Sequence, residues 1–552
     1  MKIKKLFLLA LCVIFITGIF FAGCRRDTIA STGGFGPDLL LLPTIQNMGD
    51  RFPGAWDNPG MLLRSVLFSR LLKLDSDLEP VYGDLAESWT VSPDGMTYTF
   101  TLKNNIKWHD GVPFTADDVA FSIKTAMKSP QVNGVIKSAV NCIRGAIDFT
   151  ADNSRTAADA IEGISVSGNT ITITMDQASG TFLLAMAQFN ILPRHKLEGL
   201  NPLQLNSSAF YDWPIGTGPY KVIEFIPNDY ALLEFFDDYF GPRHQIRQIK
   251  LTQMTENDYP TRALADDIDY FQTNSPDIAN AAIRNPNYRA FYTDIYFIRY
   301  LQWNSHGINS ENDPLNDIRI RRAIVHAIDL QAIIDSLLPG QATLINSKVP
   351  VSFDYSNRDV YDLGYNPERA RQLLNEAGFD FSRTLRLSCY FGDQGSRDFM
   401  DALVYYLGAV GIRSEWYLMT GDLVPQLYEN PEYHLVLAGL SAMAPEEAYN
   451  IFHSNTINTS LWGNIFPTNY RGLDRLLEEL WVTVDAGRRR QLLMEIQRVE
   501  TEEMLWHIPL YSLRNIQVFN TTRVTLPPEL VLSNEWTNYE RHLDKWTLNP
   551  AR

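Results

Sequence analysis

Residues 85–126 read LAESWTVSPDGMTYTFTLKNNIKWHDGVPFTADDVAFSIKTA, and they contain two alternating apolar segments around a turn. Apolar side chains recur at every second position on both sides of Ser92–Gly95, which is the period of half-buried strands. Pro93 presets its own φ and Gly95 tolerates a positive φ, so the four residues between the segments favour a tight turn. The stretch therefore predicts a β-hairpin.

Helix signals follow this hairpin and recur along the chain. Thr115 is typical of a helix cap, and the acidic pair Asp117–Asp118 suits the positive end of a helix. Asp317 is expected to cap a second helix that runs to Pro339–Gly340, and Asn366 a third. Because strand and helix signals alternate over a chain of 552 residues, we expect an α/β protein with mixed sheets and more than one lobe.

The N-terminus predicts export. Three lysines precede an apolar run from Leu6 to Ala22, and small residues follow, so residues 1–23 are expected to be a signal peptide. A short membrane anchor is the alternative, because about 18 apolar residues can begin to span a bilayer. The sequence Phe21–Cys24 resembles a bacterial lipobox, and this resemblance implies that Cys24 is the lipidated first residue of the mature chain.

Charge and cysteine content narrow the possible partners. Without residues 1–23 the chain keeps 45 basic and 64 acidic residues, a net charge of −19, which argues against nucleic acid. Cys142 and Cys389 are the cysteines that remain besides Cys24. A disulfide between them is one possibility, but their large separation in sequence favours two buried thiols.

Five segments, in order along the chain, together resemble the peptide/nickel type of solute-binding protein of ABC importers, which is family 5 of these proteins. The first is the stretch of residues 85–126 quoted above. The others resemble a GTGPY strand entry, a VRxAixxAiD helix, a YnPekAkqLL helix and an IPLy return strand, and they are found at Gly216–Tyr220, Arg319–Asp329, Tyr365–Leu374 and Ile508–Tyr511.

This resemblance implies an α/β fold of the two-lobed periplasmic binding protein kind (type II, cluster C), with mixed sheets and an extra subdomain on lobe one. The implied division is a signal peptide at 1–23, lobe one at 24–70 plus 180–300 plus 508–552, the extra subdomain at 71–179 and lobe two at 301–507. The chain would cross between the lobes near Tyr300–Asn304 and His507–Tyr511, which would form a hinge. A ligand would then lie in the cleft between the lobes, without a cofactor.

In peptide-binding relatives a late segment of lobe two resembles W-x-x-D-Y-x-D-P, and its carboxylate pairs with the α-amino group of the peptide. The corresponding segment here is 438–447, AGLSAMAPEE, which lacks the tryptophan and both aspartates of that pattern. Glu446 or Glu447 could substitute from a shifted position, although both also suit the acidic first turn of a helix after Pro445.

Ligand contacts are expected from this segment and from aromatic residues near the cleft. Core packing is the alternative for each aromatic ring. The candidate ligand-binding residues are Trp56, Tyr270, Phe271, Trp303, Gly439, Leu440, Ser441, Ala442, Met443 and Trp462.

Catalysis and metal binding are not expected. His109 and Asp110 are accounted for by a turn, and the acidic pair after Thr115 by its helix cap. The nine histidines form no i,i+4 pair, and the chain has no GxSxG, P-loop or CxxC motif.

The sequence thus predicts a monomeric extracytoplasmic lipoprotein, held to the membrane through Cys24, that captures an oligopeptide and delivers it to a permease driven by an ATPase. The alternatives are an oligosaccharide or another non-peptide solute, a surface sensor that has lost transport, and, less favoured, an enzyme.

Overall fold

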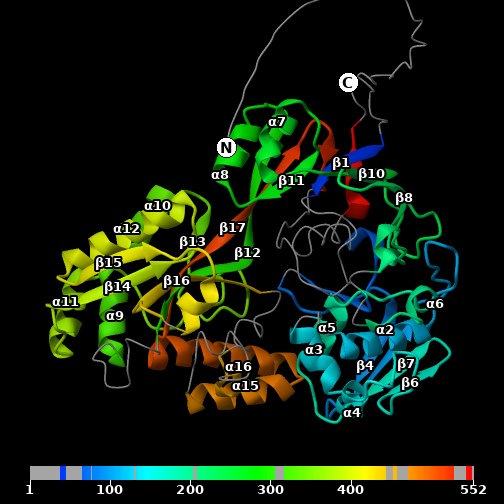
Figure 1. Ribbon diagram of the computed structural model, residues 1–552, viewed down its shortest axis with the longest axis horizontal. Coiled ribbons are helices and arrows are strands. Elements are labelled where there is room, and N and C mark those ends of the chain that lie inside the picture. The colour runs from blue at the N-terminus through cyan, green and yellow to red at the C-terminus, as the bar shows by residue number, and fades with distance from the viewer. Residues whose placement is uncertain are drawn as a thin grey trace, which may run out of the picture.

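The computed structural model describes residues 38–44, 65–75, 77–129, 132, 134–202, 205, 208–304, 316–429, 431–442, 452–456, 470–527 and 543–549. Within these ranges the chain forms two lobes of mixed sheets and helices, together with a third, separate sheet and its own helices (Figure 1).

The extra subdomain is built on the predicted hairpin. Strands β4 (Ala86–Val91) and β5 (Thr97–Leu102) pair antiparallel, and Gly95 at the turn has φ +68°. Strands β6 (Ile164–Ser167) and β7 (Thr170–Thr174) complete the sheet in the order β4-β5-β7-β6. The predicted hairpin is therefore confirmed.

Along the chain, helices lie between the strands of this sheet and after its last strand. They are α2 (Ala116–Lys128), α3 (Gly134–Asn141), α4 (Ala146–Ala151), α5 (Phe182–Gln188) and α6 (Arg194–Leu197). The expected cap at Thr115 is confirmed, because the backbone N–H of Thr115 donates to the Asp118 carboxylate at 2.8 Å in a capping box. Phe182 and Leu205 lie in the same core as the subdomain, so this core extends beyond the expected limit at residue 179.

Lobe one contains a four-stranded sheet and a helical layer beside the end of a second sheet. The four strands, in the order β1-β10-β9-β8, are Leu39–Thr44, Gln248–Gln253, Tyr230–Phe235 and Tyr220–Ile226. Strand β11 (Tyr270–Thr273) belongs to the second sheet, and α7 (Tyr259–Leu264) and α8 (Pro276–Ala282) pack near it.

Lobe two is a parallel α/β unit. Its strands β14 (Thr384–Cys389), β15 (Arg413–Leu418) and β16 (Leu435–Ser441) are parallel, with β14 in the middle. Its helices are α9 (Ile318–Ala327), α10 (Leu330–Leu337), α11 (Pro367–Glu376), α12 (Gln394–Ala409), α15 (Arg471–Val482) and α16 (Ala486–Arg498).

Two helix predictions in lobe two have different outcomes. Asn366 caps α11 as expected, since its side chain accepts the backbone N–H of Arg369. The single helix expected from Asp317 to Pro339 is wrong in its extent. The chain leaves the helix at Ile328, and Asp329 starts α10 by accepting the N–H of Ala332 at 3.0 Å.

Two long antiparallel strands connect the lobes, β12 (Tyr288–Trp303) and β17 (His507–Asn520) (Figure 1). Toward lobe one, β17 pairs with β11 through 516–519, and toward lobe two, β12 pairs with β16 from Phe297 onward. The β12–β17 register shifts between Asp294 and Ile298 and again between Arg299 and Tyr300. The first shift and the start of the β12–β16 pairing come a few residues before the crossing expected at Tyr300, and the second shift falls at it.

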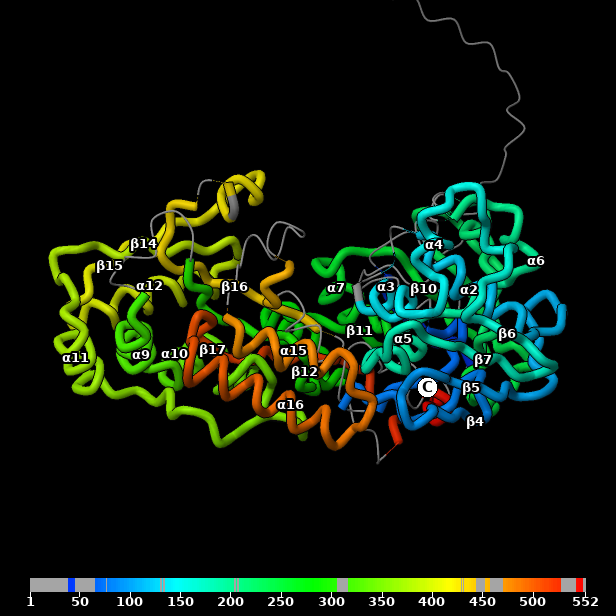
Figure 2. The backbone as a smooth tube through the Cα atoms, turned by 90° about the horizontal axis from the view of Figure 1, so that it is seen from below, coloured from blue at the N-terminus to red at the C-terminus, as the bar shows by residue number. Residues whose placement is uncertain are grey.

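Helices α15 and α16 pack on the extra subdomain (Figure 2). The N–H of Gly180 donates to the carbonyl oxygen of Trp481 at 2.6 Å, and Arg489 Nη1 donates to the carbonyl oxygen of Gly180. Gly180 is needed here because a Cβ would lie 2.6 Å from Thr483 O and 2.7 Å from Leu480 O. This helical pair, expected to belong wholly to lobe two, thus shares a core with the subdomain.

Candidate ligand-binding site

The carboxyl ends of β14 and β16 meet the part of β12 that enters lobe two. In open parallel sheets the crevice outside the carboxyl ends of the strands is the usual place for a ligand. Ser441 at the end of β16 pairs with Phe297 on β12, and Tyr390 and Phe391 directly follow β14. Helix α12 begins at the same edge, after its cap Asp393. Four segments distant in sequence therefore converge on one edge of the sheet.

The predicted segment 439–442 lies at this edge. Gly439 and Leu440 are half-buried, Ser441 is exposed, and Ala442 is buried with its N–H donating to the carbonyl oxygen of Tyr296 at 3.1 Å. Ser441 is thus the member of the segment whose side chain is open to the surroundings.

Arg299, which the sequence analysis did not single out, lies directly across from Gly439 in the β12–β16 register. Its side chain is 8 % exposed, and its guanidinium carbon is 4.4 Å from the centre of the Phe297 ring and 3.8 Å from that of Phe391. A Cβ on Gly439 would overlap Arg299 Nη1. Burial lowers the pKa of Arg299, while the nearby Tyr511, Tyr390 and Asp393 oppose that change.

The sequence carried only a faint signal for this residue. Arg299 is the one charged side chain in the apolar run from Ile295 to Trp303. Such a residue in a strand buried on both faces needs either a partner or a function, but only the fold shows what surrounds it.

Three of the aromatic candidates are core residues in this structure. Tyr270 is 0 % exposed and packs against Phe519, with ring centres 4.4 Å apart. Phe271 is also 0 % exposed and packs beside Tyr259 in a different core. Trp303 is 2 % exposed, and its Nε1 donates to Asn316 Oδ1 at 3.2 Å. The core-packing alternative therefore describes these three rings.

The remaining candidates lie outside the described residues. These are the possible ligand contacts Trp56, Met443 and Trp462, the lipidation residue Cys24, and the two glutamates 446 and 447.

A buried charged cluster lies in lobe two at the start of β17. Glu500 Oε1 accepts a hydrogen bond from His507 Nδ1 at 2.6 Å and is 3.1 Å from Lys348 Nζ, and the side chains are 1–4 % exposed. Burial lowers the pKa of His507 to about 4 and that of Lys348 to about 7. Lys348 lies over the Phe452 ring, 3.1 Å from its centre, so the cluster joins three separate segments of the chain.

A hollow of about 640 Å³ lies between the extra subdomain and lobe one, and its lining includes His109, Lys196, Trp213 and Lys221. His109 does not offer a free base there. Its Nδ1 accepts the N–H of Gly216, and its Nε2 is 3.0 Å from the carbonyl oxygen of Gly218. Burial lowers the pKa of His109 to about 4.

Neither a metal-binding cluster nor a membrane-spanning helix occurs in the described part of the chain. It holds no group of three histidine, cysteine or acidic side chains placed to bind a metal ion. None of its helices is both long and apolar enough to cross a bilayer. Cys142 and Cys389 are both free thiols.

Two lobes joined by a pair of long strands, with polar and aromatic residues at the strand ends of one lobe, define the class of two-lobed solute-binding proteins. The sequence profile of the bacterial extracellular solute-binding proteins, family 5 (middle part), matches residues 80–460, and the chain belongs to this family.

Individual relatives agree with this assignment. A protein of Brucella ovis assigned as an ABC transporter peptide-binding protein is 29 % identical over 419 residues, which cover 73 % of this chain and 72 % of that protein. The oligopeptide-binding protein AppA of Bacillus subtilis is 25 % identical over 499 residues, 84 % of this chain and 85 % of AppA. The crystal structure of the ABC transporter substrate-binding protein CtaP of Listeria monocytogenes superposes with a TM-score of 0.78 at 20 % identity, covering 93 % of this chain and all of that one.

Proposed function

We propose that this protein is an extracytoplasmic, lipid-anchored binding protein that captures an oligopeptide between its lobes and delivers it to an ABC permease with its ATPase. The observation that carries the proposal is the edge where β14 and β16 end beside the middle of β12, because exposed Ser441, half-buried aromatic rings and a buried cation meet there and β12 continues from this edge into lobe one. The names of the relatives support a peptide as the ligand.

Closure is proposed to occur by bending of β12 and β17 where their sheet partners change. Few connections cross between the lobes at this point, so a small change in backbone angles there would move one lobe as a body. Closure of this hinge would bring the edge at the ends of β14 and β16 toward lobe one.

Mass spectrometry of the small molecules released when the purified protein is denatured would identify the ligand class. Recovery of peptides would support the proposal, and recovery of sugars alone would end it. A peptide recovered in this way can then be titrated by calorimetry into Ser441→Trp, which is expected to lose binding while staying folded. Thr384→Trp is the matched control, because Thr384 is exposed at the opposite end of β14.

The anchor is tested separately. In the native host, Cys24→Ser is expected to move the protein from the membrane fraction to the soluble extracytoplasmic fraction. A Cys24→Ser protein that stays in the membrane fraction would contradict lipidation at this residue.

A further inference from the structure

Arg299 differs from the other buried arginines in what surrounds its N–H groups. Arg321, which is 3 % exposed, donates from Nε and Nη2 to the carbonyl oxygen of Met504 and from Nη1 to that of Asn316, at 2.8–3.1 Å. Arg299 Nη1 is also buried, yet it has no hydrogen-bond partner among the residues that the structure describes. A buried donor without an acceptor lowers the stability of the fold, the more so when it is charged, so such a group requires an explanation.

The aromatic rings do not supply the missing acceptor. Phe297 and Phe391 contact the guanidinium through their ring faces, which attract a cation. The N–H bonds of a guanidinium lie in its plane, at its edges, and there they match the two oxygens of a carboxylate.

Asp393, the acidic side chain that acts on Arg299, is already engaged. Asp393 acts on Arg299 only at longer range, and no ion pair joins them within the described residues. Its Oδ1 accepts the backbone N–H of Ser396, and its Oδ2 accepts the hydroxyl of the same residue, both at 2.8 Å. These bonds are what the N-terminus of α12 requires of its cap.

Gly439 has no side chain, and the guanidinium of Arg299 occupies the space that a side chain there would fill. Any side chain there would collide with Arg299 Nη1, and the N–H of Gly439 donates to Tyr390 Oη at 3.1 Å. The pair Arg299–Gly439 thus places a cation at the strand-end edge where Ser441 is exposed.

We propose that Arg299, held by Phe297, Phe391 and Gly439, is an anchor for a carboxylate of the ligand. This inference rests on the proposed function and adds to it the chemical class of the recognised group. A peptide offers such a group at its C-terminus or on an acidic side chain.

The variant for the test is Arg299→Met, which keeps the length and apolar stem of the side chain and removes the guanidinium. Arg386→Met is the matched control, because Arg386 is an exposed ion-paired residue at the other end of β14 and its loss changes the net charge equally. Gly439→Ala is a second test variant that displaces the guanidinium without removing it.

The first probe is sodium acetate, compared with sodium chloride at equal ionic strength through the thermal unfolding midpoint. The extra stabilisation by acetate over chloride is expected to be larger in the wild type and Arg386→Met than in Arg299→Met, which should keep only the general effect of the salt. An equal acetate effect in Arg299→Met and the wild type would overturn the proposal. Arg299→Met itself is expected to unfold no earlier than the wild type in chloride, since it removes an unpaired buried charge.

The second probe is a pool of short peptides made both as free acids and as C-terminal amides, with the retained peptides identified by mass. The wild type should prefer free acids by roughly tenfold or more, and Arg299→Met and Gly439→Ala should lose that preference. Retention of amides that carry Asp or Glu would assign the carboxylate to a side chain.

The two probes separate the possible failures. If the wild type and Arg299→Met both retain free acids and neutral amides equally well, the protein binds peptides but Arg299 is not a carboxylate anchor. A specific acetate effect that depends on Arg299, with no peptide retained, would keep the anchor and refute the peptide function.

Discussion

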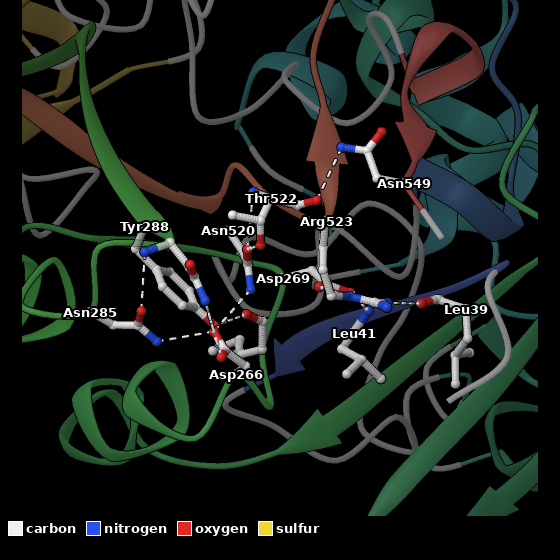
Figure 3. A network of polar contacts seen from close by, with 12 residues as sticks. Leu39, Leu41, Asp266, Asp269, Asn285, Tyr288, Asn520, Thr522, Arg523 and Asn549 are labelled. Atoms are coloured by element: carbon white, nitrogen blue, oxygen red, sulfur yellow. Dashed lines mark hydrogen bonds and ion pairs between the residues drawn. The ribbon is translucent and has the colours of Figure 1, made fainter. Parts of the chain in front are cut away.

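Asp269 shows how one residue holds lobe one together (Figure 3). Its carboxylate is 0 % exposed, accepts the backbone N–H of Leu41 at 2.8 Å and is 2.7 Å from Arg523 Nε. Arg523 also donates to the carbonyl oxygen of Leu39 at 2.8 Å. Burial raises the pKa of Asp269, and the neighbouring Arg523 opposes this. The pair thereby ties β1 to the ends of β11 and β17.

Asp269→Asn is expected to destabilise the protein by about 3–5 kcal/mol, because it leaves the Arg523 guanidinium partly buried without its counter-charge. Urea unfolding would measure the loss. Asp267→Asn is the control, since the Arg262–Asp267 pair is more exposed and should contribute about 1 kcal/mol or less. Similar losses in the two variants would contradict this account.

His507 makes the stability depend on pH. The pKa of His507 is about 4 in the folded protein, against the ordinary value of 6.5, because burial and the positive Lys348 outweigh the Glu500 hydrogen bond. The unfolded chain therefore binds more protons between these two values, so the free energy of unfolding falls as pH is lowered from 6.5 to 4. One such shift corresponds to about 3 kcal/mol at most.

His507→Gln keeps a donor for Glu500 but does not titrate, so its stability should fall less steeply over that range of pH. The two neighbouring groups change charge above this range of pH or toward its lower end. Lys348 does so above it, because its pKa is about 7. Glu500 does so toward the lower end, because Lys348 and His507 hold its pKa below the ordinary value of 4.5 in spite of burial. Chemical unfolding at several pH values would show the difference, and parallel curves for the two proteins would refute it.

At the scale of elements, short sequence patterns correctly predicted a turn and helix caps, which are determined by neighbouring residues. The turn at Ser92–Gly95 and the caps at Thr115 and Asn366 depend on a few neighbouring residues, and each is found as expected. The helix after Asp317 was predicted too long, because its apolar spacing continues through Ile328 although Asp329 begins a new helix. Apolar periodicity alone does not show where a helix is interrupted.

Gly180 contacts α15 and α16, which lie about 300 residues further along the chain. Gly180→Ala is expected to cost about 1–3 kcal/mol, because its methyl group would press on the carbonyl oxygens of Leu480 and Thr483. Gly199→Ala serves as the control, since no atom lies within 4 Å of its added Cβ. Thermal unfolding of the two variants would test this contact, and equal midpoints would contradict it.

At the scale of the whole molecule, α15 and α16 link lobe two to the extra subdomain of lobe one (Figure 2). Arg489 is central to this link, since its Nη1 donates to carbonyl oxygens of both Gly180 and Thr483. The contact spans the two bodies that a hinge at β12 and β17 would separate, and we expect it to favour the closed arrangement.

Arg489→Met is therefore expected to increase the radius of gyration of the ligand-free protein in small-angle X-ray scattering. Arg490→Met is the control, because Arg490 pairs with Asp354, 2.6 Å away, within the same lobe and at the surface. An unchanged radius in Arg489→Met would show that this contact does not affect the opening of the lobes.

The amino-acid sequence alone was sufficient to predict the family, the α/β class, the hairpin and the helix caps, because each depends on residues close together along the chain. It also directed attention to segment 438–447, where the expected carboxylates are missing. Tertiary structure decided which side chains reach the strand-end edge. Arg299 and Gly439 are 140 residues apart and meet only through the β12–β16 register, whereas Tyr270 and Phe271 are buried by sheet packing. Such long-range contacts leave no local pattern, because strand pairing and core packing are properties of the folded chain.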